Sequence, residues 1–190
     1  MYAFFKYWIL ILFVITTIGC TNKKDISTDF NCNTNSYFNN TKAFKDVLKK
    51  FTTSIPKSWK TELYYDEFQS KIYSADTTKQ LSETYIIDIA WHQGNLNFNT
   101  EFETKIANLL SVKEKLKTQK QGYGIFLNHN SYYNLSSGKK GNITYHLLQV
   151  YMQYKNDEYY TFTTKIYGDT FVEERICASF SLFKNTIFIP

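Results

Sequence analysis

Histidine and cysteine are scarce in this chain, since each occurs three times among 190 residues. The histidines, His92, His129 and His146, lie far apart, and no HxH, HxxxH or CxxC pattern is present. Metal sites in proteins draw most of their ligands from His, Cys, Asp and Glu at short, recurring spacings. The sequence therefore predicts no metal site and no cofactor.

Motifs for covalent catalysis and for phosphate binding are also missing. No Gly-x-Ser-x-Gly sequence is present, and Cys177 has no neighbouring histidine or group of cations that would produce a thiolate. The pair Gly122-x-Gly124 lacks the third glycine and the lysine of a phosphate-binding loop. We therefore predict no catalytic residue.

Positively charged residues are in slight excess and do not cluster in one part of the sequence. The chain has 22 lysine and arginine residues against 17 aspartate and glutamate residues, a net charge of +5. Apart from the pairs Lys23-Lys24, Lys49-Lys50 and Lys139-Lys140, the basic residues are dispersed. We predict no nucleic-acid partner and interpret the charge as solvation, with weak attraction to anionic lipid headgroups as the functional alternative.

The chain has no apolar run long enough to span a membrane, because the stretch at residues 9–18 falls short of the about 20 residues that a bilayer requires. Lys6 precedes this stretch, and Gly19 stands directly before Cys20. This order is typical of a bacterial lipoprotein signal. We interpret residues 1–19 as a signal peptide and Cys20 as the site of fatty acid (palmitate) attachment, with a plain secretory signal as the alternative.

Composition divides the remaining chain into two parts. Residues 20–42 are rich in Asn, Ser, Thr, Lys and Asp and show little apolar pattern, which predicts a flexible tether. Residues 43–190 have enough apolar and aromatic content for a single packed domain. Thr21 and Asn22 do not resemble the Asp that retains many lipoproteins at the inner membrane. We therefore expect a lipid-anchored envelope protein at the outer membrane, facing the periplasm.

Two cysteines remain in a compartment that permits oxidation. A disulfide between Cys32 and Cys177 would tie the linker to the last helix, but the sequence does not establish that their Cα atoms are close enough. The alternative is a small buried Cys177 and a free thiol at Cys32. The sequence leaves both possibilities open.

Two kinds of apolar periodicity alternate along residues 43–190. Alternating large side chains predict a strand at residues 83–92, because successive side chains of a strand point to opposite faces. Steps of three and four predict helices at residues 44–51, at residues 101–118 and after residue 170. The last two follow the capping boxes Thr100-x-x-Glu103 and Thr170-x-x-Glu173. Further strands are predicted at residues 59–65, 68–75, 125–127, 131–135, 143–154 and 159–167. This order predicts an α+β fold with a central antiparallel sheet flanked by helices.

Three segments carry a resemblance to a known family. Residues 51–59 end in Ile-Pro-x-x-Trp, a hairpin follows, and Ile-Tyr-Gly-Asp at residues 166–169 precedes the last helix. Together they resemble the PsbP-like superfamily, which includes the DcrB-like bacterial envelope lipoproteins. The resemblance covers residues 44–189 and implies an α/β/α sandwich. It carries over no catalytic residue, because members of the superfamily mostly bind or stabilise other proteins.

We therefore expect a non-enzymatic envelope lipoprotein whose domain binds or stabilises another envelope protein or a small ligand. Its expected partners are the membrane, through the lipid, and a protein of the envelope. Many tyrosines in the second half of the chain could form a contact surface or fill the sheet. The alternative is a periplasmic hydrolase whose catalytic residues converge only in the fold, in a pocket that gathers the histidines with carboxylates.

Overall fold

The computed structural model describes residues 24–32 and 38–190, so the predicted signal peptide and Cys20 lie outside the described residues. The strands are β1 (Thr41–Lys45), β2 (Phe51–Pro56), β3 (Lys60–Tyr65), β4 (Gln69–Ala75), β5 (Tyr85–Gln93), β6 (Lys117–Phe126), β7 (His129–Lys140), β8 (Ile143–Lys155), β9 (Glu158–Tyr167) and β10 (Ile187–Phe188). The helical elements are the 3-10 helix η2 (Ile26–Phe30), α2 (Thr100–Asn108), the π-helical turn η3 (Leu109–Lys113) and α3 (Val172–Phe183).

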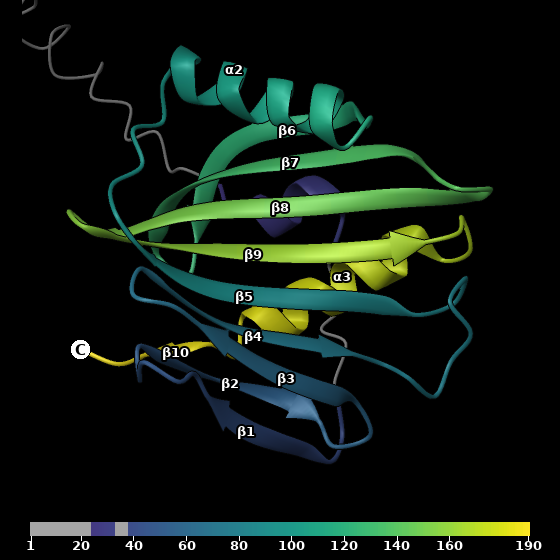
Figure 1. Cartoon of the computed structure of the whole chain (residues 1–190), viewed down its shortest axis with the longest axis horizontal. Coiled ribbons are helices and arrows are strands. Elements are labelled where there is room, and N and C mark those ends of the chain that lie inside the picture. Colours follow the sequence, from purple (N-terminus) through teal and green to yellow (C-terminus); the bar gives the residue numbers. More distant parts are fainter. Residues whose placement is uncertain (1–23, 33–37) are drawn as a thin grey trace, which may run out of the picture.

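The strands form two antiparallel sheets (Figure 1). The large sheet has the order β3-β4-β5-β9-β8-β7-β6, and the small sheet has the order β1-β2-β10. This architecture confirms the predicted α+β class and its central antiparallel sheet. In the part of the chain that the structure describes, no helix has the length and hydropathy needed to cross a bilayer.

Helices cover the two faces of the large sheet unequally. Helix α3 and η2 lie behind the sheet in Figure 1 and bury the larger apolar cluster, whereas α2 packs on the other face beside β7 and β8. Each fully buried large apolar side chain contributes about 1.5–3 kcal/mol. No described helix covers the area of β4, β5 and β9 opposite α3. We call this area the front face, and its side chains include Lys71, Tyr73, Asp88, Thr163 and Lys165.

Strand β5 shows how the apolar pattern positions these faces. Tyr85, Ile87, Ile89 and Trp91 are all buried in the cluster under α3. The side chains between them, Asp88 among them, point to the front face, because side chains alternate along a strand. The predicted strand at residues 83–92 is confirmed.

The predicted helix at residues 44–51 is wrong, because this segment forms the end of β1, a tight turn and the start of β2. The Asp46 carboxylate accepts hydrogen bonds from the N–H groups of Lys50 and Phe51, each at 2.7 Å. These bonds close the turn, and Phe51 enters the core with no exposed surface. Four apolar residues in so short a window fit a helix and a strand-turn-strand unit equally well.

Part of the predicted tether packs on the domain. Ile26 is fully buried, and the N–H of Ile125 on β6 donates to the carbonyl of Lys24 at 3.0 Å. A Cβ atom at Gly124 would lie 2.6 Å from the Lys24 oxygen, so glycine permits this close approach. Burial of Ile26 and this backbone hydrogen bond help to dock a segment whose composition is otherwise polar. The domain in the structure therefore includes residues 24–32, ahead of the predicted boundary at residue 43.

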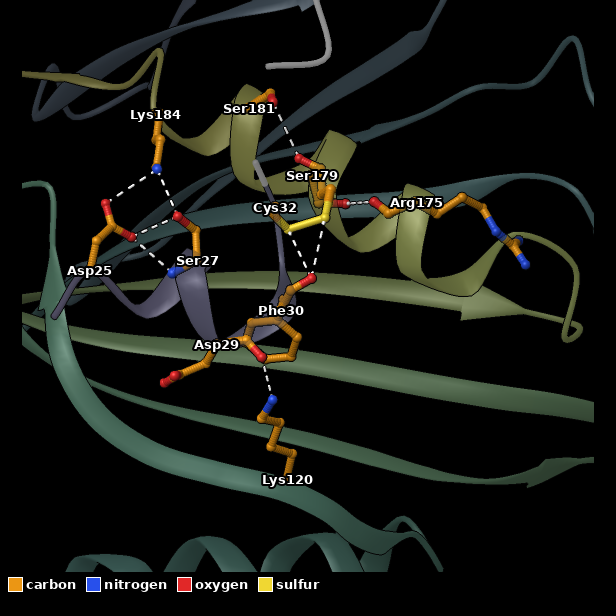
Figure 2. Close-up of a disulfide and its surroundings, with 11 residues drawn as sticks. Asp25, Ser27, Asp29, Phe30, Cys32, Lys120, Arg175, Ser179, Ser181 and Lys184 are labelled. Carbon is orange, nitrogen blue, oxygen red and sulfur yellow. Dashed lines mark hydrogen bonds and ion pairs between the residues drawn. A yellow bond between two sulfur atoms is a disulfide. The ribbon is translucent and has the colours of Figure 1, made fainter. Parts of the chain in front are cut away.

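The segment 24–32 is also linked covalently to α3 (Figure 2). Cys32 and Cys177 form a disulfide with Cα atoms 5.1 Å apart, and the sequence had left this pairing open. The Phe30 ring lies 5.1 Å from the Tyr133 ring and 5.4 Å from the Phe180 ring. The disulfide thus joins the segment to α3 at a place where Phe30 also packs against rings of the sheet and of α3.

The predicted helix at residues 101–118 is too long. Helix α2 ends at Asn108, one π-helical turn follows, and the chain has entered β6 by Lys117. The side chain of Asn99, not that of Thr100, caps α2 by accepting a hydrogen bond from the Phe102 N–H at 2.9 Å. Strand β6 runs through Gly122 and Gly124.

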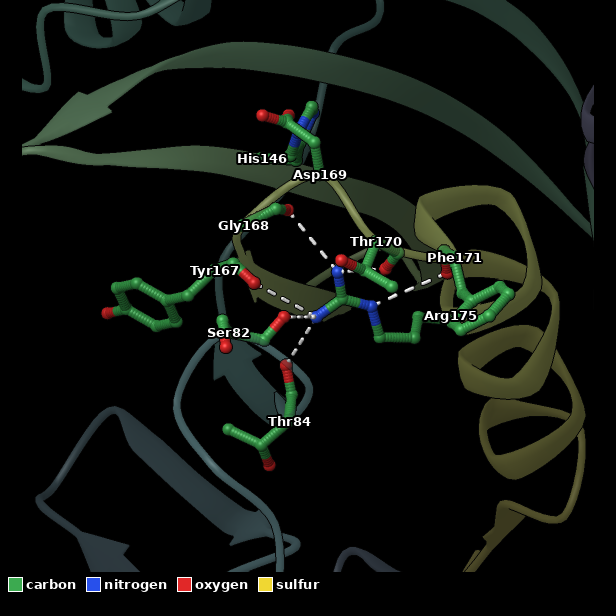
Figure 3. Close-up of polar contacts among 9 residues, drawn as sticks. All are labelled: Ser82, Thr84, His146, Tyr167, Gly168, Asp169, Thr170, Phe171 and Arg175. Carbon is green, nitrogen blue, oxygen red and sulfur yellow. Dashed lines mark hydrogen bonds and ion pairs between the residues drawn. The ribbon is translucent and has the colours of Figure 1, made fainter.

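Helix α3 begins without the predicted capping box. Its N-cap is Phe171, which has a left-handed φ of 50° and makes no capping hydrogen bond with its side chain. The guanidinium of Arg175, whose residue is 6% exposed, instead donates to backbone carbonyls around the start of α3 (Figure 3). The acceptors are Ser82 (3.4 Å), Thr84 (2.8 Å), Tyr167 (3.0 Å), Gly168 (3.3 Å), Thr170 and Phe171 (3.4 Å). One buried side chain therefore ties α3 to the ends of β5 and β9.

Candidate binding surface

The three histidines lie in separate places. His92 on β5 points to the front-face side of the sheet, whereas His129 and His146 lie on the α3 side, beside opposite ends of β8. His146 Nε2 is 3.0 Å from Asp169 Oδ1. Within residues 24–32 and 38–190, no group of three His, Cys, Asp or Glu side chains could hold a metal ion. The placement of the histidines therefore gives no support to a hydrolase site built on them.

The front face carries one carboxylate between two lysines. Lys71 Nζ lies 3.8 Å from Asp88 Oδ2, and Lys165 lies on the neighbouring strand β9. Burial raises the pKa of the Asp88 carboxyl, although both lysines oppose this shift. Burial lowers the pKa of Lys165, which Asp88 counteracts. These charges are partly withdrawn from water, so a partner that reaches them would meet poorly screened groups.

An aromatic group lies at the edge of the sheet beside these charges. Leu63, Tyr64, Tyr65 and Phe68 on the β3–β4 hairpin are 42%, 46%, 64% and 58% exposed. We call these four residues the hairpin patch. Strand β3 is an edge strand of the large sheet, and no described strand pairs with its outer side. An edge strand presents unpaired N–H and carbonyl groups that can pair with another chain.

Tyr64 joins the hairpin patch to the front face. Its ring packs edge-on against Tyr73 with centroids 6.4 Å apart, and Lys71 Nζ lies 5.4 Å from the ring centroid. The ammonium of Lys71 also pairs with Asp88, so the rings and charges form one continuous surface. Such a surface combines large contact area with directional polar groups, as protein-binding surfaces do.

The hairpin patch was not predicted from the sequence. The tyrosines of the second half of the chain were a possible contact surface, but most of these fill the sheet. Tyr132, Tyr133, Tyr151 and Tyr160 are buried. The available signal was the run of three apolar residues at 63–65, which places an apolar side chain on both faces of one strand. Such a run in an edge strand leaves at least one of them in water.

The surroundings of His92 predict that the protein loses stability measurably in acid. Its Nε2 lies 2.9 Å from Thr161 Oγ1, and its ring stacks on Tyr159 at 4.6 Å. Burial lowers the pKa of His92 to about 4, with Lys71 acting in the same direction and Asp66 opposing it. Because the unfolded chain takes up this proton near pH 6.5 and the folded chain does not, stability falls as the pH falls from 6.5 towards 4.

We expect His92 alone to lower the free energy of unfolding by about 2 kcal/mol when the pH falls from 7 to 5. Urea unfolding of the unsubstituted protein and of His92→Gln at both pH values measures this cost, since the other titrating groups are common to both proteins. The His92→Gln protein should lose less stability by that amount. Equal losses in the two proteins would show that His92 titrates normally in the folded state.

No protein-family model matches this sequence, and no curated protein matches it. Among solved structures, the chain is similar to the cyanobacterial PsbP protein (CyanoP) of Synechocystis, with a TM-score of 0.60 and 6% identity over 82% of this chain and 96% of that chain. It is also similar to LpqN of Mycobacterium tuberculosis, described as involved in cell envelope biogenesis, with a TM-score of 0.49 and 9% identity over 88% of this chain and 99% of that chain. A TM-score below 0.5 carries no weight, so the assignment of the fold rests on the similarity to CyanoP. That similarity does not single out the DcrB-like lipoproteins. The seven-stranded sheet with α3 and α2 on its two faces is therefore a PsbP-like fold.

Proposed function

We propose that this chain is a non-enzymatic lipoprotein of the bacterial envelope, anchored through Cys20, whose PsbP-like domain binds a partner protein at the hairpin patch. The observation that carries the proposal is the exposed aromatic group on an unpaired edge strand. The lipoprotein signal supports the anchor. On the same sequence grounds we propose the outer membrane, on the periplasmic side, as its location.

Strand addition is the binding mode that this surface favours. A partner segment in extended conformation would pair its backbone with the outer side of β3, which supplies affinity through main-chain hydrogen bonds. Side chains of β3 flank that position on both faces of the sheet, with Tyr64 on the front face and Tyr65 on the other. Tyrosine offers a large contact area at a low cost in conformational entropy.

The charges of the front face would select among partners. Lys71, Asp88 and Lys165 lie beyond Tyr64 on the same face, so an incoming side chain that passes the tyrosine meets them next. Two lysines against one aspartate favour an acidic group on the partner. Complementary charges of this kind mostly set specificity and association rate.

Site-specific photo-crosslinking on native membranes tests the proposal. A photoreactive residue replaces Tyr65 in the full-length chain, and the control replaces Phe171, which is 69% exposed and lies at the start of α3. We expect one defined protein adduct from position 65 and none from position 171. The same adducts from both positions, or none from position 65, would contradict binding at the hairpin patch.

A paired substitution measures the contribution of the patch. Tyr65→Ser with Phe68→Ser should reduce the yield of the adduct, formed in this case from a photoreactive residue at position 64, by at least tenfold. The matched control is Phe171→Asn, because asparagine tolerates a positive φ. All three positions are exposed, so both variants should unfold within about 0.5 kcal/mol of the unsubstituted protein. An unchanged yield with the paired substitution would place the contact elsewhere.

A further inference from the structure

We propose that the outer surface of α2 and η3 rests on the anionic bilayer that holds Cys20. The proposal depends on the lipid anchor proposed above and adds an orientation to it. We call this surface the α2 surface, and it comprises Glu101, Lys105, Leu109, Val112 and Lys113. Three observations support it: the place where the docked chain begins, the elements beside that place, and the side chains that this surface exposes.

The chain is docked on the domain from Lys24 onwards, close to the anchor. The Lys24 carbonyl accepts from the Ile125 N–H at 3.0 Å, and Asp25 forms a parallel bridge with Ile125. Lys24 is four positions after Cys20 in the sequence. A fully extended chain of that length reaches about 14 Å, so the Lys24 edge of the domain must lie within that distance of the lipid-bearing residue.

Helix α2 borders this docking point. A cavity of about 410 Å³ is lined by Lys24 together with Phe98 and Tyr123. Phe98 directly precedes the cap of α2, and its ring centroid lies 6.0 Å from that of Tyr123. The Tyr123 hydroxyl is hydrogen-bonded to Glu103 of α2. The first turn of α2 therefore lies at the same edge of the domain as Lys24. The short anchor segment would hold this edge near the membrane.

The α2 surface exposes apolar side chains among lysines. Val112 is 73% exposed, more than any other large apolar side chain in the described residues, and Leu109 is 37% exposed. Both line an open groove along α2 and η3, together with Lys105 and Lys113. Apolar side chains flanked by lysines are typical of helices that lie in the plane of a membrane interface.

The charge of this region favours anionic lipid. The α2 surface has Lys105 and Lys113 against Glu101, a net charge of +1. Two nearby carboxylates have partners on the domain itself, because Glu103 accepts a hydrogen bond from the Tyr123 hydroxyl and Glu114 lies 3.4 Å from the Lys140 ammonium. Each lysine close to an anionic membrane surface contributes about 1 kcal/mol. The lysines of the α2 surface thus supply attraction in addition to the lipid anchor.

This orientation would leave the hairpin patch free for a partner. Strands β6 and β3 are the two edges of the large sheet, and α2 and β3 lie at opposite sides of the molecule in Figure 1. With the α2 surface on the bilayer, the outer side of β3 faces away from the membrane. A single placement on the bilayer therefore serves both the lipid anchor and the proposed protein contact.

Tryptophan quenching in vesicles tests the orientation. Lipidated Val112→Trp, processed to begin at Cys20, is reconstituted in phosphatidylcholine vesicles with 30% phosphatidylglycerol and brominated acyl chains, and Tyr65→Trp, at the opposite edge, is the matched control. The native Trp59 and Trp91 are 8% and 4% exposed and give a constant background. We expect at least twofold quenching of the emission that the Val112→Trp substitution adds and no quenching of the emission that Tyr65→Trp adds. Quenching should weaken without phosphatidylglycerol.

The possible failures are distinguishable. Flotation with vesicles and the mass of the amino terminus report on the anchor, with Cys20→Ala as the unlipidated reference. If no fatty acid is attached to the unsubstituted protein, the anchor fails and the orientation, which depends on it, fails with it. If lipidated Val112→Trp floats but its added emission is not quenched, only the orientation is overturned. Shielding of the indole at position 112 that depends on protein concentration and not on brominated lipid would instead assign the α2 surface to a second copy of the chain.

Discussion

Arg175→Ala is expected to lower the free energy of unfolding by about 3–5 kcal/mol, because it removes a buried charged donor and takes a hydrogen bond from each of its acceptors. Arg175 is 6% exposed and donates to six backbone carbonyls. Those of Ser82 and Thr84 precede β5, and the other four lie between the end of β9 and the start of α3. Three parts of the chain would therefore lose a common contact.

Arg175→Lys separates geometry from charge. Lysine keeps the positive charge but has one donor nitrogen on a flexible stem, whereas the planar guanidinium has five N–H groups. We expect Arg175→Lys to recover less than half of the loss seen in Arg175→Ala. Urea unfolding at pH 7 measures both variants. Full recovery by lysine would show that charge alone matters, and a loss below 1 kcal/mol in Arg175→Ala would contradict the role assigned to the carbonyl contacts.

Removal of the disulfide should have the other large effect. The bond between Cys32 and Cys177 spans 145 positions, and closure of so long a loop in the unfolded chain corresponds to about 5 kcal/mol in the chain-entropy treatment. Measured values are commonly lower, and we expect Cys32→Ser with Cys177→Ser to lose about 2–5 kcal/mol. The loss should also be local, because the bond holds residues 24–32 on α3.

Two measurements check this expectation. Urea unfolding with and without dithiothreitol should show a reductant-dependent midpoint in the unsubstituted protein and none in the double serine variant. Limited proteolysis should cleave within residues 24–32 faster in the variant, although the Lys184 contacts with Asp25 (3.2 Å) and Ser27 (2.8 Å) remain. Two reactive thiols in the folded, non-reduced protein would show that the bond does not form.

Much of the fold could be predicted from local patterns. Strand β5, the hairpin of β3 and β4 and the long pair β8 and β9 follow from alternation and turn residues, because each pattern reports which side of a strand meets the core. The failures have local causes. Asp46 closes a turn where apolar spacing suggested a helix, and Ile26 docks a segment whose average composition is polar.

The candidate surface could not be predicted in the same way. Whether the apolar run at residues 63–65 is buried depends on whether β3 has neighbours on one side or on both, and the strand order decides this. Arg175 resembles an ordinary charged residue of an amphipathic helix in sequence. Its role depends on carbonyls more than 90 positions away, such as that of Thr84. No local sequence pattern indicates either the exposure of residues 63–65 or the role of Arg175.

The amino-acid sequence alone determined the α+β class, the faces of the principal strands and the expected anchor at Cys20, because these depend on periodicity and composition within short windows. The tertiary structure decided which strand is exposed at the edge, which cysteines meet and which surface lies beside Lys24. These properties arise from contacts between distant segments. Their energies depend on positions in space that no short window of sequence contains.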